Sequence, residues 1–99
     1  HGVACAVLIA PVVKWNLPCC EEKYAQMAQV CNFGKTGEDF LNGAVRLAES
    51  VGTARNFRAY GLERKHFPFI VKNCRSASMK SNPREMSDDE VISLLEGLL

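Results

Sequence analysis

An almost unbroken apolar run opens the chain and does most to limit its fold. The run extends from Gly2 to Val13, and the first charged side chain is Lys14. A helix buried on all sides explains such a run best, and it needs neighbours on every face. Because 99 residues supply only some of those neighbours, we expect that the chain is a fragment and that further protein covers this helix.

The same run is too short to suggest a membrane segment. It falls short of the ~20 apolar residues that a helix needs to span a bilayer. No basic segment precedes it, as one would in a signal peptide. The sequence therefore predicts no membrane partner.

The rest of the chain also shows helical spacing, because apolar residues recur three and four positions apart. The pattern predicts helices at residues 2–15, 19–32, from Thr36 to Gly52, at 65–77 and from Ser87 to the C-terminus, with a short helical turn at 54–60. Pro11 predicts a kink, and Pro18 ends the first helix. We predict an all-α fold of about six helices, arranged as an orthogonal bundle.

Two capping signals support this division. Thr36 is followed three residues later by Asp39, and Ser87 by Glu90. In such a capping box each side chain satisfies a free backbone N–H at the start of a helix. The helices beginning after Thr36 and Ser87 are therefore the best defined.

Charge and cysteine content limit the partners and the compartment. Twelve basic residues nearly balance 11 acidic ones, with a net charge of +1. The sequence has no stripe of basic residues that would suggest binding to nucleic acid. The number of cysteines is odd, with no C-x-x-C pair, which favours reduced thiols in a cytoplasmic protein. The five cysteines are Cys5, Cys19, Cys20, Cys31 and Cys74.

Only two stretches carry residues of chemical interest, His1-Gly2 and the segment at 81–84, Ser-Asn-Pro-Arg. A histidine at a chain end is most simply an exposed residue, and Asn before Pro is most simply a turn. His66, near the start of a predicted helix, is expected to face solvent. The residues alone indicate a helical domain with a possible metal-binding histidine at its edge.

The order of the short segments is more distinctive than any one of them. The chain opens with HGVACA, continues through Leu8 and Pro11, and reaches NLP. After it come the segments EKYA, VGT, YGL, FP and SNPR, in that order, and then a capped helix. This succession resembles the C-terminal helical domain of the iron-containing (group III) alcohol dehydrogenases, over all 99 residues.

The resemblance implies a dehydroquinate synthase-like, two-domain enzyme of the cytoplasm, expected to be a homodimer. Its N-terminal domain binds NAD or NADP, and its helical domain closes the cleft. An Asp and three His hold Fe²⁺ or Zn²⁺, which polarises the oxygen of a small alcohol or aldehyde during hydride transfer. Residues 1–99 would be the C-terminal metal-binding domain, with the nucleotide-binding domain absent, and inactive in isolation.

His1-Gly2 matches the end of the family's Pro-His-Gly motif, so His1 would be the last metal ligand. The other ligands and the cofactor loop would lie upstream, and no catalytic or cofactor-binding residue is assigned in this chain.

The sequence departs from the family pattern at three positions. Many relatives have Asn where Cys5 stands, and His or Tyr where Val12 stands. Many also have a Cys near the substrate pocket where Ser78 stands. Asn82 and Arg84 are expected to order their loop near the domain junction or dimer contact. Ser78, Asn82 and Arg84 are therefore the candidate substrate-pocket or loop residues.

Two other readings compete with the enzyme. In one, the chain is a stand-alone helical module whose exposed apolar surface binds another protein. In the other, His1 is a mature N-terminus that chelates copper, as in oxidative polysaccharide-cleaving enzymes beginning His-Gly. Those enzymes are β-sandwiches, and the helical periodicity argues against them.

Overall fold

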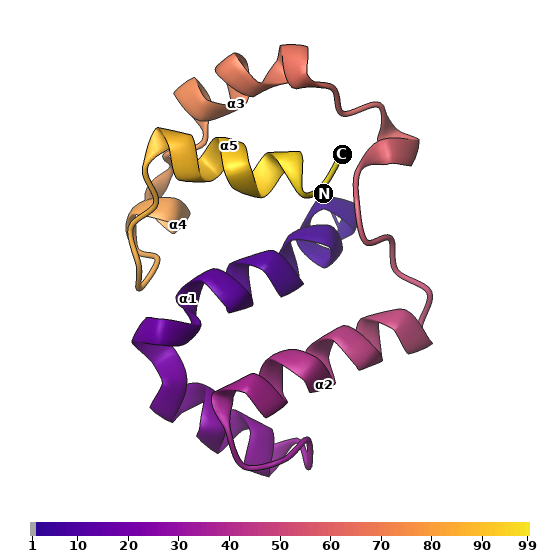
Figure 1. Ribbon diagram of the computed structural model, residues 1–99, viewed down its shortest axis with the longest axis vertical. Helices are drawn as coiled ribbons and strands as arrows, with labels where there is room; N and C mark the ends of the chain where they lie inside the picture. The colour runs from indigo at the N-terminus through magenta and orange to yellow at the C-terminus, as the bar shows by residue number, and fades with distance from the viewer. Residues whose placement is uncertain (1) are drawn as a thin grey trace. The chain divides into compact units, whose positions relative to one another are not determined.

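The computed structural model describes residues 2–99, which form helices joined by turns and contain no β-strand. Five α-helices and two 3₁₀ turns follow one another along the chain (Figure 1). They are α1 (Gly2–Val30), α2 (Gly37–Ser50), η1 (Arg58–Tyr60), η2 (Arg64–His66), α3 (Phe67–Asn73), α4 (Ala77–Lys80) and α5 (Asp88–Glu96). The all-α prediction is confirmed.

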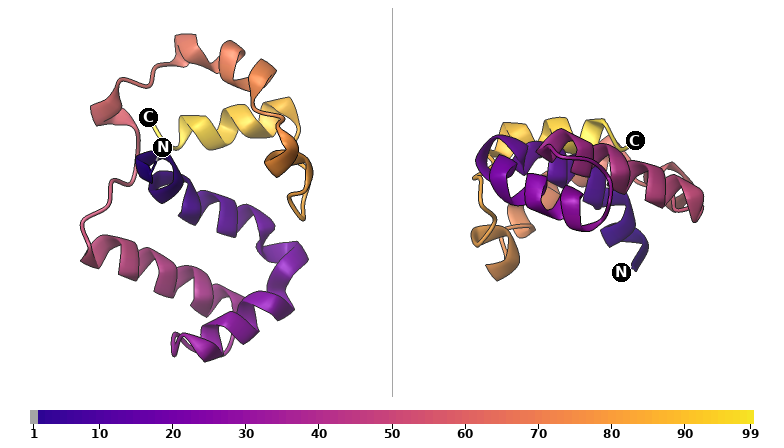
Figure 2. Two further views of the ribbon diagram at one scale, coloured as in Figure 1. Left: turned by 180° about the vertical axis from the view of Figure 1, so that it is seen from behind. Right: turned by 90° about the horizontal axis from the view of Figure 1, so that it is seen from below.

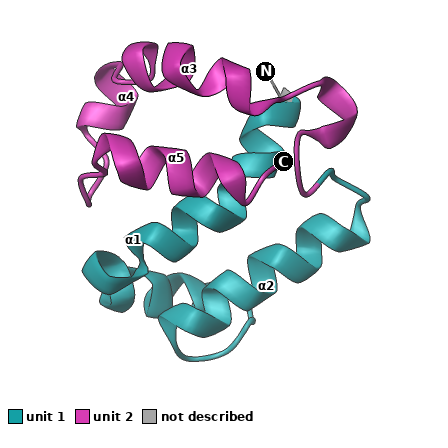
Figure 3. Cartoon of the chain, turned by 45° about the horizontal axis from the view of Figure 1, so that its top comes forward, with its two compact units in different colours: residues 1–54 teal, residues 55–99 magenta. Residues whose placement is uncertain are grey.

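The chain divides into two compact units, His1–Ala54 and Arg55–Leu99 (Figure 3). The first unit contains α1 and α2, and the second contains the remaining helices.

α1 differs from the two helices predicted at 2–15 and 19–32. It continues through the expected break at Asn16–Pro18, and its backbone leaves helical geometry at Cys20, with φ −127° and ψ 16°. The ribbon changes direction part-way along (Figure 2). A following proline only biases a residue away from the helical region. Here Asn16 is buried, 4% exposed, and its side chain bonds to that of Tyr24, further along the same helix, so the stretch before Pro18 has stabilising contacts of its own.

The surroundings of α1 are also more open than its sequence suggests. In the described chain Val7 is buried, whereas Val3 is 41% and Ile9 50% exposed. By length and composition alone, the segment Val3–Val30 could cross a membrane, although the core helix of a soluble protein meets the same criteria. The helix is longer than the apolar run from Gly2 to Val13, so the length of that run does not rule out a membrane segment.

α2 packs against α1 and the turn that follows it. The contacts are aromatic rings and a hydrogen bond from a backbone N–H to a side chain. The Tyr24 and Phe40 ring centroids lie 5.2 Å apart, and those of Phe33 and Phe40 6.3 Å apart. The N–H of Gly37 donates to Glu21 Oε1 at 2.9 Å. The first turn of α2 is thereby tied to the second half of α1.

Gly43 makes close packing of α2 possible. A Cβ atom at this position would overlap the ring of Phe33. The glycine is therefore required by packing, although it weakens the helix locally.

Both predicted capping boxes are confirmed. The Thr36 hydroxyl accepts from Asp39 N–H at 3.1 Å, and Asp39 Oδ2 accepts from the N–H groups of Thr36 at 3.1 Å and Lys35 at 2.9 Å. At α5, Ser87 Oγ accepts from Glu90 N–H at 3.2 Å, and Glu90 Oε1 accepts from Ser87 N–H at 2.9 Å. These ends are fixed by residues three apart in sequence.

In the second unit, α3 packs on α5 around a small core. Its buried members are Phe67, Val91 and Leu95, with Leu62, Ile70, Val71, Cys74, Met79, Met86, Ile92 and Leu99 packed against them. The helix predicted at 65–77 is shorter than expected, because α3 ends at Asn73. Asn73 Nδ2 donates to the Phe69 carbonyl at 2.8 Å, a local bond that competes with helix continuation.

Candidate functional site

The predicted metal ligand His1 lies outside the described residues, and α1 begins at Gly2. Within residues 2–99, no group of three or more His, Cys, Asp or Glu side chains is placed to hold a metal ion. One imidazole does not supply the ligand set of a catalytic metal centre. The described residues therefore do not fit iron or zinc by themselves, and the role of His1 stays a prediction.

His66 faces solvent, as predicted. Its Nδ1 accepts a hydrogen bond from the backbone N–H of Glu63 at 3.1 Å. The ring therefore helps to form the turn that leads into α3, which is a structural role.

The predicted loop residues are organised around Asn82. Its Nδ2 donates to the Arg84 carbonyl at 2.8 Å, and its backbone N–H donates to the Met79 carbonyl at 3.1 Å. Ser78 lies on α4 with an exposed side chain, and its carbonyl accepts from Ser81 Oγ at 3.0 Å. The Asn82 side chain is thus joined to the backbone of Arg84, whereas Ser78 contributes its carbonyl to the loop and its side chain is exposed.

Arg84 lies within electrostatic reach of the first turn of α5. The pKa of Glu90 is lowered mainly by hydrogen bonds from the Ser87 backbone and side chain, and to a smaller extent by the positive charge of Arg84. Asn82 and Arg84 therefore connect the loop to the start of the last helix.

The sequence did not predict a groove that lies along α3 and α5. It has a volume of about 720 Å³ and is lined by Arg64, Phe67, Pro68, Val71, Lys72, Arg75, Asp88 and Ile92. Its floor is apolar and its rim is basic. Helical spacing in the sequence is a signal for this surface. The apolar residues Phe67 and Val71 are four positions apart, and the basic residues Lys72 and Arg75 are three apart.

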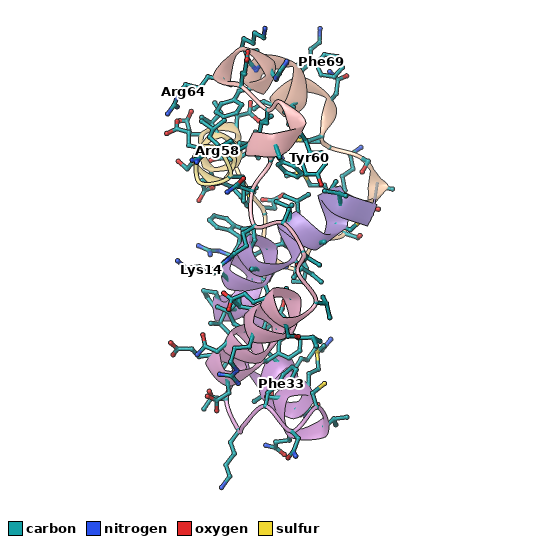
Figure 4. All side chains as sticks on the ribbon, turned by 90° about the vertical axis from the view of Figure 1, so that its right-hand side faces the viewer. Lys14, Phe33, Arg58, Tyr60, Arg64 and Phe69 are labelled. Atoms are coloured by element: carbon teal, nitrogen blue, oxygen red, sulfur yellow. The ribbon has the colours of Figure 1, made fainter. Side chains whose placement is uncertain are left out.

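Two of the basic side chains that line the groove form ion pairs. Arg75 Nη2 lies 2.6 Å from Asp88 Oδ1, and this bond raises the pKa of Arg75. Arg64 Nη1 lies 3.5 Å from Glu96 Oε1. Arg64 and Phe69, which is 73% exposed, project outward in Figure 4. Ser78, Asn82 and Arg84 do not line this groove.

A polar contact inside α1 is the second feature missed from the sequence. The Tyr24 side chain bonds to those of Asn16 and Cys20, and burial raises the pKa of Tyr24 more than these neighbours alter it. The sequence pattern predicts Asn16 only as part of a helix end.

Comparison with known proteins decides the family. The profile of the C-terminal region of the Fe-containing alcohol dehydrogenase family matches residues 1–99. The chain belongs to the iron-containing alcohol dehydrogenase family. The resemblance drawn from its ordered segments is confirmed.

Several curated members of the iron-containing alcohol dehydrogenase family align with this chain. The 1,3-propanediol dehydrogenase of Klebsiella pneumoniae is 29% identical over 95% of the chain and 26% of the relative. The NADPH-dependent butanol dehydrogenase of Clostridium saccharobutylicum is 26% identical over 97% of the chain and 27% of the relative. The lactaldehyde reductase of Escherichia coli K12 is 28% identical over 95% of the chain and 27% of the relative.

The chain spans about a quarter of the length of the curated relatives it matches (26% of the first). No solved structure gives a significant match to it.

Proposed function

We propose that this chain is the C-terminal helical part of a metal-dependent alcohol dehydrogenase or aldehyde reductase. The observation that carries the proposal is the family match over residues 1–99. The curated relatives support it, because they are named as dehydrogenases or reductases of an alcohol or aldehyde.

The substrate we propose is a small alcohol or aldehyde. The names of three relatives specify 1,3-propanediol, butanol and lactaldehyde. Hydride would pass between such a substrate and NAD or NADP, and a bound Fe²⁺ or Zn²⁺ would polarise the substrate oxygen. The nucleotide would be held by an N-terminal domain, in a homodimeric protein.

Within this chain, we propose His1 as the last metal ligand, on its match to the Pro-His-Gly motif. Asn82 and Arg84 would order the loop before α5, which the bond from Asn82 Nδ2 to the Arg84 carbonyl supports. Ser78 remains a candidate for the substrate pocket. A cytoplasmic location is proposed because all five cysteines are free thiols.

The test uses the longest natural polypeptide that contains this chain. The purified protein is loaded with Fe²⁺ or Zn²⁺, and oxidation of NADH and NADPH is followed with propanal, butanal and lactaldehyde. We expect turnover with at least one pair. The variant His1→Ala is expected to lose bound metal and activity together, whereas His66→Ala, at an exposed structural turn, keeps both.

The absence of hydride transfer in the metal-loaded natural polypeptide would overturn the proposal. It would favour the alternative of a helical protein-interaction module, to which the exposed side chains of Val30 and Val51 in the first unit would contribute.

A further inference from the structure

Two adjacent cysteines lie at the kink of α1. Cys19 is exposed and Cys20 is half-buried, and both are free thiols. Cys20 is also the one residue inside α1 whose dihedral angles leave the helical region, with φ −127° and ψ 16°. The bend in the helix therefore coincides with the dithiol.

The altered φ brings the two side chains closer. In a regular helix φ is about −63°, so the backbone at Cys20 is rotated by about 60° about its N–Cα bond. At helical φ the Cβ of the second residue lies near the plane of the peptide that joins the pair, and points away from the first Cβ. The rotation moves it toward the face on which the Cys19 Cβ lies. The Cβ–Cβ distance thereby shortens toward the ~3.5–4.5 Å that a disulfide requires.

The two thiols are held differently by their surroundings. Cys20 bonds to the Tyr24 side chain, which also bonds to buried Asn16. Tyr24 in turn packs on Phe40 of α2, with ring centroids 5.2 Å apart. Cys20 is thus anchored to the packed interior of the unit, whereas Cys19 is open to a reagent from solvent.

The other cysteine on the first half of the helix is too distant to compete. Cys5 and Cys19 are separated by 14 positions of α1, or about 20 Å at the helical rise. A disulfide needs Cα atoms within about 7 Å. An oxidised Cys19 therefore has Cys20, and not Cys5, as its resolving thiol within the helix.

We propose that Cys19 and Cys20 form a redox-active dithiol that closes to a vicinal disulfide by exchange with a low-molecular-weight disulfide such as glutathione disulfide. The Cys19 thiolate attacks one sulfur of the reagent, forming a mixed disulfide and releasing one glutathione thiolate. The Cys20 thiolate then attacks Cys19 Sγ, forming the Cys19–Cys20 bond and releasing the second glutathione. The two cysteines lose two electrons and two protons, and the reagent is reduced to two thiols.

The test uses a chain in which only the pair remains, C5S/C31S/C74S, incubated with excess glutathione disulfide, alkylated and digested. We expect the peptide that contains both cysteines to lose the mass of two hydrogen atoms and to carry no glutathione. In C20S added to this background, Cys19 is expected to accumulate as a stable glutathione adduct. In C19S, the half-buried Cys20 is expected to react several times more slowly.

Folding provides the matched control. The same chain in denaturant lacks the kink, so ring closure is expected several times less readily than in the folded chain. A lasting glutathione adduct when both cysteines are present, two unmodified thiols, a disulfide-linked dimer, or equal closure in the denatured chain would each overturn the proposal.

Discussion

At the scale of single residues, packing explains a glycine whose sequence context gives no reason for it. Gly43 lies inside α2, where glycine is unfavourable by about 1 kcal/mol relative to alanine. The Phe33 ring occupies the space that a side chain would need. Local propensity and tertiary packing therefore oppose each other at this position, and packing has the larger effect.

We predict that Gly43→Ala destabilises the chain despite the gain in helix propensity. Overpacking costs about 1–3 kcal/mol, against about 1 kcal/mol gained, so the urea midpoint should fall. Gly97→Ala is the matched control, because its added Cβ would have the Leu94 carbonyl oxygen as its nearest neighbour at 3.4 Å. A higher midpoint for Gly43→Ala would show that Phe33 moves aside freely.

The capping carboxylates predict a pH dependence of stability. Hydrogen bonds from the N–H groups of Lys35 and Thr36 lower the pKa of Asp39 from its usual 3.8, and bonds from Ser87 lower that of Glu90 from its usual 4.5. A carboxyl whose folded-state pKa is lowered stabilises the fold above its unfolded-state pKa. That contribution is lost as the pH falls through the lower folded-state value.

We therefore expect the unfolding free energy to decrease as the pH falls below about 4.5. Asp39→Asn and Glu90→Gln should each flatten this decrease in urea titrations at several pH values. Glu38→Gln, in the same turn as Asp39 but outside the capping box, is the control. An unchanged slope in both cap variants would contradict the assignment.

At the scale of elements, a part-buried hydrogen bond joins the start of α2 to α1. Gly37 N–H is among the N-terminal donors of α2 that have no partner within their own helix, and Glu21 of α1 supplies its acceptor at 2.9 Å. The sequence separation of 16 residues explains why no local pattern predicted this bond.

We predict that Glu21→Ala lowers stability by about 1–3 kcal/mol, because it leaves a buried N–H without its acceptor. Glu21→Gln retains a side-chain oxygen and should restore part of the loss. Glu22 provides the comparison, because among the described residues it forms no hydrogen bond to α2: Glu22→Ala should change the unfolding free energy by less than about 0.5 kcal/mol. Equal effects of the two alanine variants would exclude a specific role for the Glu21 bond.

At the scale of the whole molecule, the described chain carries only part of what its family requires. Residues 2–99 contain no group of ligands for a metal ion, and the chain spans 26% of its first curated relative. The helical part must therefore gain its chemistry from further residues if the proposed function holds.

We accordingly predict that the 99-residue chain alone binds Zn²⁺ or Fe²⁺ weakly and has no dehydrogenase activity. Isothermal titration should show no tight, stoichiometric uptake, since a single imidazole does not complete a metal site. The natural polypeptide provides the positive control. Tight binding that is lost in His1→Ala of the 99-residue chain would contradict this expectation.

The sequence by itself determined the helical class, the starts of α2 and α5, and the family. Those features depend on contacts between residues a few positions apart, or on the order of motifs along the chain. The resulting interactions, such as Thr36 with Asp39, are confirmed without reference to distant residues.

Only the tertiary structure decided the position of the kink at Cys20, the burial of Asn16, the need for glycine at position 43 and the groove along α3 and α5. Proline placed the expected break two to four residues too early, at Asn16–Pro18, whereas the backbone leaves helical geometry at Cys20. The kink, the burial of Asn16 and the contact between Gly43 and Phe33 depend on groups brought together by folding, and no local pattern predicts them. For the groove, helical spacing indicates only which residues share a face of α3, and folding brings α5 beside them.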